Sequence, residues 1–301
     1  MEIYAGRKFP RARDVAMSER YVAWAAGQSA VVEDRRTGAE LFRVKKLSYM
    51  YWVDIVPDES MLIVQGTVPI VYFFALPGGE LIRKIRLGRE GSAQDSLRAV
   101  DPAGRFMIYP LQTSDGLTRI LRIDLKTLDF QTLDEISGRW RLASALPGQD
   151  GAIEIVGTGA LDVAGEKRAG LERVRLVDGV PVEWQDLSSL GGSTPDPPEV
   201  CLDGQQIWCA SGDKLRRAGA NLEILNEIVL EEKDRPWSLR LAGGLLWGTN
   251  LWGVTVHDPG SLEILFRCRC LGGVLRVREL EGGQVLISPF KGGAFIADIR
   301  F

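Results

Sequence analysis

The stretch that decides the fold runs from Val200 to Leu271, because it contains two consecutive copies of one unit. The first copy reads VCLDGQQIWC (200–209), then KLRRA (214–218), then LEIL (222–225). The second copy reads SLRLAGGLLWG (238–248), then VTVHD (254–258), then LEIL (262–265). The two LEIL runs begin 40 residues apart. A period near 40 residues, built of four short apolar runs, is typical of a blade of a β-propeller.

Tight polar turns repeat along the rest of the chain, each followed by an apolar run that favours a strand. They read MSER (17–20), PDES (57–60), DPAG (101–104), PGQDG (147–151), DGQ (203–205), AGG (242–244) and EGG (281–283). Seven turns predict an all-β protein with seven blades of four antiparallel strands. We expect residues 1–301 to form a single β-propeller domain.

The third strand of most repeats ends at an aspartate, which can accept hydrogen bonds from backbone N–H groups two residues further on. These residues are Asp34, Asp124, Asp178, Asp258 and Asp298. The fourth strands are predicted to open at Leu41, Leu81, Leu128, Val182, Leu222 and Leu262. Irregular spacing predicts insertions at 111–117, 157–170 and 188–198.

The seventh unit contains only three predicted strands, the last of which includes the closing DIRF (298–301). The segment EIYA (2–5) resembles the start of the other fourth strands. We therefore expect the N-terminal strand to join the C-terminal blade and close the ring, which removes two free sheet edges.

The composition sets limits on partners and location. Lys and Arg total 37 against 40 Asp and Glu, a net charge of -3, so no global positive field attracts nucleic acid or an anionic membrane. No apolar run is long enough to span a bilayer, and the N-terminus lacks the pattern of a leader peptide. Four cysteines favour a reducing compartment, so the cytoplasm is the predicted location.

The chain resembles the broad superfamily of seven-bladed WD40-like and quinoprotein-like (YVTN-type) propellers over essentially its whole length. Asp34, Asp124, Asp258 and Asp298 stand where WD40 repeats close their third strand with Trp-Asp, but the Trp and the Gly-His of that family are absent. The pairing of Asp34 with TGAEL (37–41) is similar to the turn of quinoprotein-type repeats, without their tryptophan-docking pattern. The resemblance implies the fold and no active site.

Aromatic residues gather in the loops before several first strands and in one turn. A rigid face that carries Trp, Tyr and Arg has the composition of a binding hot spot. The predicted contacts for a protein or peptide partner are Tyr51, Trp52, Trp140, Trp237 and Trp252. The alternative is that these side chains pack between blades, as we expect for Trp24, Trp208 and Trp247.

Arginines recur at one register of the first strands, near the expected mouth of the central channel. These are Arg13, Arg98, Arg141 and Arg276, with Arg240 and Arg278 two residues further along their strands. Converging guanidinium groups could bind an anionic small molecule bidentately. The alternative is that each pairs with a carboxylate inside the ring, namely Asp14, Asp54, Asp101, Glu199 or Glu279.

Motifs for catalysis and metal binding find little support. His257 is the only histidine, and we expect it to be structural. Cys201, Cys209, Cys268 and Cys270 lack metal-ligand spacing, so buried free thiols are expected. The segment GTGALD (157–162) fails the dinucleotide fingerprint. The sequence therefore predicts a non-catalytic interaction scaffold without metal or cofactor. A small-molecule binder or enzyme with an arginine-rich channel mouth is the alternative, and a quinone-dependent dehydrogenase ranks third.

Overall fold

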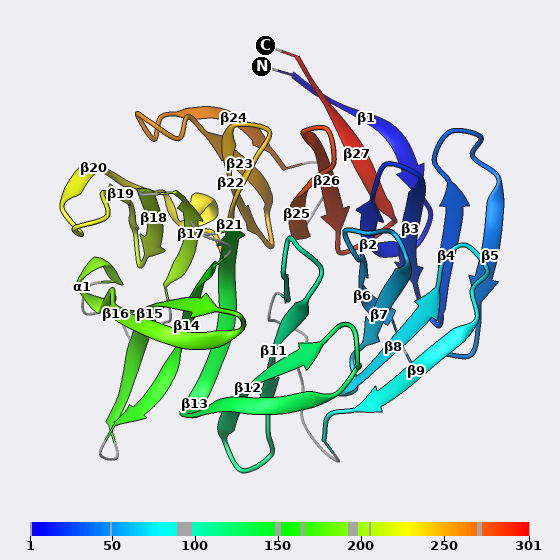
Figure 1. The fold of residues 1–301 in the computed structure, drawn as a ribbon. Helices are drawn as coiled ribbons and strands as arrows, with labels where there is room; N and C mark the ends of the chain where they lie inside the picture. Colours follow the sequence, from blue (N-terminus) through cyan, green and yellow to red (C-terminus); the bar gives the residue numbers. More distant parts are fainter. Residues whose placement is uncertain are drawn as a thin grey trace.

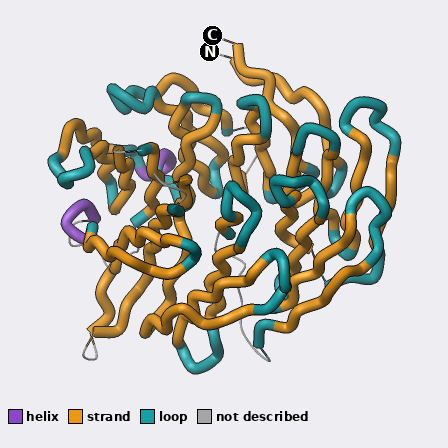
Figure 2. The backbone as a smooth tube through the Cα atoms, viewed as in Figure 1, coloured by secondary structure: helices purple, strands orange, loops and turns teal. Residues whose placement is uncertain are grey.

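The computed structural model describes residues 2–48, 50–88, 98–147, 152–163, 166–191, 198–204, 206–269 and 273–300. Antiparallel strands form seven blades around a ring (Figure 1), which confirms the predicted propeller. Strands dominate the backbone, and loops occupy mainly the ends of the blades (Figure 2). None of the helical segments in the described ranges has the length and apolar character of a transmembrane helix.

Each blade has the strand order expected of an antiparallel meander. The first blade comprises β2 (Ala12–Met17), β3 (Tyr21–Ala26), β4 (Ser29–Asp34) and β5 (Glu40–Val44). The second comprises β6 (Met50–Ile55), β7 (Met61–Gly66), β8 (Ile70–Ala75) and β9 (Leu81–Arg86). The third comprises β10 (Ala99–Val100), β11 (Phe106–Gln112), β12 (Leu117–Asp124) and the start of β13 (Phe130–Pro147). The fourth and fifth comprise the end of β13, β14 (Ile153–Val163), β15 (Glu166–Val177) and β16 (Val180–Asp186); and β17 (Glu199–Asp203), β18 (Gln206–Ser211), β19 (Lys214–Ala218) and β20 (Ile224–Val229). The sixth and seventh comprise β21 (Ser238–Ala242), β22 (Leu245–Asn250), β23 (Gly253–His257) and β24 (Ile264–Cys268); and β25 (Val274–Leu280), β26 (Gln284–Pro289), β27 (Ala294–Arg300) and β1 (Glu2–Phe9).

Strand β13 serves two blades in turn. It pairs with β12 as far as Ser137, and from Gly138 onward it pairs with β14. Gly138 has φ +102° at this change of partner, a conformation that favours glycine. The insertion predicted at 157–170 lengthens the β14–β15 hairpin, whose last pair is Val163 with Glu166. The insertion predicted at 188–198 contains the short helix α1 (Ser188–Gly191), and residues 192–197 lie outside the described residues.

The ring closes as predicted, by the N-terminal strand. β1 pairs antiparallel with β27 from Glu2 with Arg300 to Phe9 with Ala294, and the termini lie side by side (Figure 1). A buried ion pair reinforces the closure, because Asp14 of the first blade accepts from Arg276 at 3.0 Å and Arg278 at 3.3 Å in the last blade.

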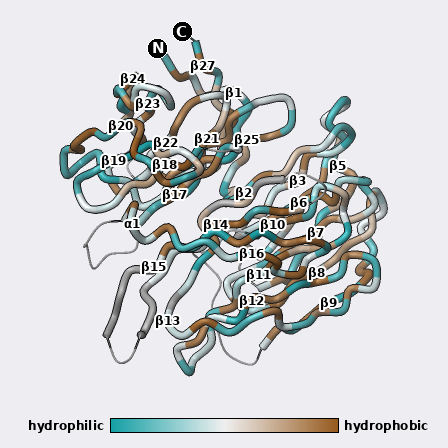
Figure 3. The backbone as a smooth tube through the Cα atoms, turned by 60° about the vertical axis from the view of Figure 1, so that its left-hand side comes forward, coloured by the Kyte–Doolittle hydropathy of each residue, from teal (hydrophilic) through white to brown (hydrophobic). Residues whose placement is uncertain are grey.

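Apolar side chains fill the space between the blades. Seven hydrophobic clusters join neighbouring blades around the ring, including one between the seventh and the first. The strands carry hydrophobic stretches, and many connecting loops are hydrophilic (Figure 3). The side chains of Trp24, Trp208 and Trp247 are buried in these clusters or beside them, as predicted.

The aspartate turns behave as predicted in three blades. Asp34 accepts from the N–H of Thr37 at 2.7 Å, Asp124 from that of Lys126 at 2.9 Å, and Asp258 from that of Gly260 at 2.9 Å. These bonds fix the turns that lead into the outer strands.

The predicted start of three outer strands is wrong by two residues. Leu128, Leu222 and Leu262 have φ of +59°, +66° and +66°, and they belong to the turn before the strand. Gly38 and Gly79 occupy the equivalent place in the first two blades with φ +71° and +81°. The turn requires a left-handed residue there, and β propensity alone does not reveal that a leucine fills the position.

Candidate functional site

In the sixth and seventh blades, the loop that enters the first strand and the turn between the second and third strands lie at the same end of the blade. In the sixth, the antiparallel register puts Ser238 opposite Thr249, so the loop that enters β21 lies beside the turn between β22 and β23. The N–H of Trp237 donates to the carbonyl of Thr249 at 2.9 Å and joins them. In the seventh, Val274 lies opposite Pro289, which puts the β26–β27 turn at the same end.

The turn between β22 and β23 exposes two apolar side chains. Leu251 is 64% exposed and Trp252 is 53% exposed. The buried Asn250 fixes the turn, because its side-chain oxygen accepts the N–H of Trp252 at 2.8 Å and its amide donates to the carbonyl of Lys233 at 2.8 Å. Gly253 is required at φ +140°, since a Cβ there would lie 1.9 Å from the carbonyl oxygen of Cys268. The exposed tryptophan therefore stands on a rigid support.

The loop that enters β21 is anchored by a buried carboxylate. Asp234, within the 3-10 turn η2 (Glu232–Asp234), accepts from Thr255 at 3.0 Å and from Arg267 at 2.9 Å, and it also pairs with Arg269. Burial raises the pKa of Asp234, but the hydrogen bonds from Arg267 and Thr255 and the charges of Arg267 and Arg269 outweigh burial and hold the pKa below its usual value. Lys233 in this loop lies 5.9 Å from the ring centre of Trp252.

A second aromatic pair extends this surface to the next blade. The rings of Trp237 and Phe290 meet edge to face with centroids 5.3 Å apart, and the indole N–H of Trp237 donates to the carbonyl of Val274 at 3.2 Å. Arg13 of the first blade donates to the carbonyl of Phe290 at 2.8 Å. A Cβ on Gly273 would lie 2.6 Å from the Phe290 ring and 3.3 Å from the Cα of Leu251, so the turns of both blades are neighbours. We call Trp237, Leu251, Trp252 and Phe290 the loop-face patch.

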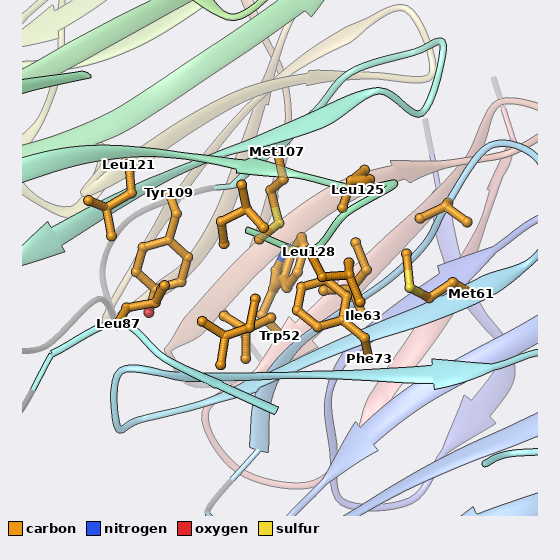
Figure 4. Packing of buried hydrophobic residues seen from close by; sticks show 14 of the residues in the cluster. Trp52, Met61, Ile63, Phe73, Leu87, Met107, Tyr109, Leu121, Leu125 and Leu128 are labelled. Carbon is orange, nitrogen blue, oxygen red and sulfur yellow. The ribbon is translucent and has the colours of Figure 1, made fainter. Parts of the chain in front are cut away.

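Only part of the aromatic set predicted from the sequence lies in this patch. Trp237 and Trp252 belong to it. Trp52 is 4% exposed and packs between the second and third blades against Phe73 and Met107 (Figure 4). Trp140 is fully buried, and its ring packs so closely on Gly157 that a Cβ there would collide with it. The side chain of Tyr51 lies outside the described residues. Trp52 and Trp140 thus take the packing role that the sequence left open, because first-strand residues face the neighbouring blade.

Leu251 and Phe290 are the members of the patch that sequence reasoning missed. Both lie in turns between second and third strands, where one end of a propeller exposes its side chains. The signal in the sequence is that NLW (250–252) and SPF (288–290) both span the end of a second strand and the start of the turn after it.

The four arginines predicted at the channel mouth do not form a ring of guanidinium groups open to a ligand, because each has a partner in the protein. Arg141 pairs with Glu199 and Arg276 with Asp14, as the alternative interpretation held. Arg98 donates to the side-chain oxygen of Gln65 at 2.6 Å and lies 4.3 Å above the ring of Tyr109. Arg13 belongs to the loop face beside Phe290.

The single histidine is buried and has a structural contact. Its Nδ1 lies 2.9 Å from the carbonyl oxygen of Leu262, which ties β23 to the following turn. Burial lowers the pKa of His257, against the hydrogen bond to that carbonyl. Cys201 and Cys209 are buried thiols, Cys268 is half-buried, and Cys270 lies outside the described residues.

Comparison with known proteins shows a similarity of fold only. The chain is similar in structure to Sqt1 of Saccharomyces cerevisiae. That crystal structure matches with a TM-score of 0.65 at 12% identity, over 98% of this chain and 85% of the other. No family model matches the sequence, and no curated protein matches it.

Proposed function

We propose that this protein is a non-catalytic propeller scaffold that binds a protein partner through the loop-face patch. The observation that carries the proposal is the exposure of Leu251 and Trp252 on a turn that Asn250 and Gly253 hold rigid. Tryptophan anchors on rigid supports dominate the energy of protein interfaces, because little conformational entropy is lost when they are buried.

The charges around the patch favour a particular partner chemistry. Exposed basic side chains at its rim are Arg235, Lys291 and Lys233, and the half-buried Arg13 adds a further positive charge, while Glu231 and Glu232 are the exposed acids of the same loop. Electrostatic complementarity steers association. The proposed partner therefore presents an apolar side chain to Trp252 with acidic residues around it.

The test is affinity purification from the native cell with wild type, Trp252→Ala and Trp184→Ala, followed by mass spectrometry. Trp184 is the matched control because it is 43% exposed on the outer strand β16, away from the patch. The proposal requires a protein that wild type and Trp184→Ala retain and Trp252→Ala loses, and whose purified form binds at least tenfold more weakly to Trp252→Ala. Equal retention by Trp252→Ala and wild type would contradict it, and so would catalytic turnover by the purified protein.

A further inference from the structure

A cavity of about 180 Å³ lies where the first strands of several blades converge. Its charged lining residues are Asp54 of β6, Arg98 before β10, Arg240 of β21, and Arg276, Arg278 and Glu279 of β25. The volume is below the roughly 300 Å³ at which pockets for drug-sized ligands begin. The space therefore suits an ion or a very small molecule.

Asp54, Arg276 and Arg278 of this wall take part in ion pairs that also include Asp14. Arg278 pairs with Asp54 at 2.9 Å and with Asp14 at 3.3 Å, and Arg276 pairs with Asp14 at 3.0 Å. Glu279 accepts the N–H of Gly243 at 3.3 Å. Four guanidinium groups thus face three carboxylates, those of Asp14, Asp54 and Glu279, among the described residues of this wall.

Arg98 and Arg240 lie outside these pairs, and of the two Arg98 is held by the side-chain oxygen of Gln65 at 2.6 Å. Arg240 donates only to the carbonyl of the adjacent Leu239 at 2.6 Å, and no described Asp or Glu lies within ion-pair distance of it. Burial, and then the charges of Arg276 and Arg141, lower the pKa of Arg240 to about 10, although interaction with Cys201 acts the other way. An arginine at this pKa still carries its full charge near neutral pH, and a cation held among other cations in a protein wall favours an anionic partner.

We propose that this channel cavity is a binding site for a small oxyanion, a phosphate or a short carboxylate, anchored by Arg240. The planar fork of a guanidinium matches two oxygens of such an anion, and the neighbouring arginines add attraction without leaving their own carboxylates. This site is separate from the loop-face patch, so the two proposals can fail independently. It also replaces the predicted ring of Arg13, Arg98, Arg141 and Arg276 by a site centred on a different arginine.

The test is isothermal titration calorimetry of the full chain with inorganic phosphate, and in a second series with malonate, at low ionic strength. We expect saturable binding of at least one anion at one site, at least tenfold weaker in Arg240→Gln. Arg240→Lys keeps the charge without the fork, so it should fall between the two. Arg13→Gln and Trp252→Ala are the controls and should keep the wild-type affinity.

Thermal unfolding without added anion shows whether the variant folds. Arg240→Gln removes an uncompensated charge, so it should unfold at the wild-type temperature or above, while added phosphate should raise the unfolding temperature of wild type alone. Absence of saturable binding of both anions by wild type, or unchanged affinity in a folded Arg240→Gln, would overturn the proposal.

Discussion

Leu262 combines an unfavourable backbone conformation with a favourable side-chain position. Its φ of +66° is left-handed, which costs a non-glycine residue about 1–2 kcal/mol. Its side chain is fully buried between the fifth and sixth blades, and deletion of a buried leucine costs about 2–5 kcal/mol. Burial therefore outweighs the backbone cost.

We predict that Leu262→Gly lowers the free energy of unfolding by about 2 kcal/mol, because the loss of packing exceeds the relief of strain. Leu222→Gly is the matched comparison, since Leu222 has the same φ of +66° but is only partly buried. Urea denaturation should show a clearly smaller loss for Leu222→Gly. Equal losses, or a stabilised Leu262→Gly, would show that packing does not hold this turn.

At the scale of the element, the turns between third and fourth strands depend on ionised aspartates. Hydrogen bonds from the backbone N–H groups of Thr127 and Ser261 lower the pKa values of Asp124 and Asp258 below their usual 3.8, against partial desolvation. A carboxyl whose pKa is lower in the folded state stabilises the protein above the unfolded pKa, and that contribution is lost as the pH falls through the folded pKa.

We therefore expect wild type to lose stability below about pH 4, and the double variant Asp124→Asn/Asp258→Asn to lose less over the same range. Asparagine keeps the acceptor oxygen and does not titrate. Because the turns are close to solvent, each replacement should cost at most about 1 kcal/mol at pH 7. Denaturation midpoints from pH 7 to pH 2 provide the test, with the exposed Asp203→Asn as control. If the denaturation midpoints fall by the same amount at low pH in wild type and the double variant, the aspartates do not have this role.

At the scale of the whole molecule, the strand that closes the ring joins the two ends of the chain. Without β1, the edge of β27 would be open, and the cluster that contains Phe9 would be exposed. We predict that deletion of residues 1–9 lowers the unfolding temperature and causes association, measured by thermal unfolding and sedimentation. Tyr4→Ser, at a 46% exposed position of the same strand, should do neither. A truncated chain that stays monomeric with unchanged unfolding temperature would refute the closure as a stabilising feature.

The blade pattern could be predicted because strand period, turn residues and repeat length are local properties of the sequence. The candidate site could not, because exposure depends on which blade covers a side chain. Trp52 and Trp252 look alike as residues near turns, yet one is 4% and the other 53% exposed. Likewise the partners of Arg276 and Arg278 come from the opposite end of the chain, at Asp14, and only the closed ring brings them together.

The measurement that tests the central claim most directly is site-specific photo-crosslinking in the native cell. A photoreactive phenylalanine analogue placed at position 251, which is 64% exposed beside Trp252 in the same turn, should give a discrete covalent adduct with a partner protein while Trp252 stays in place. The same analogue at position 184, which is 43% exposed on the outer strand β16, should give none. Adducts at 184 and none at 251 would place the interaction elsewhere and contradict the loop-face account.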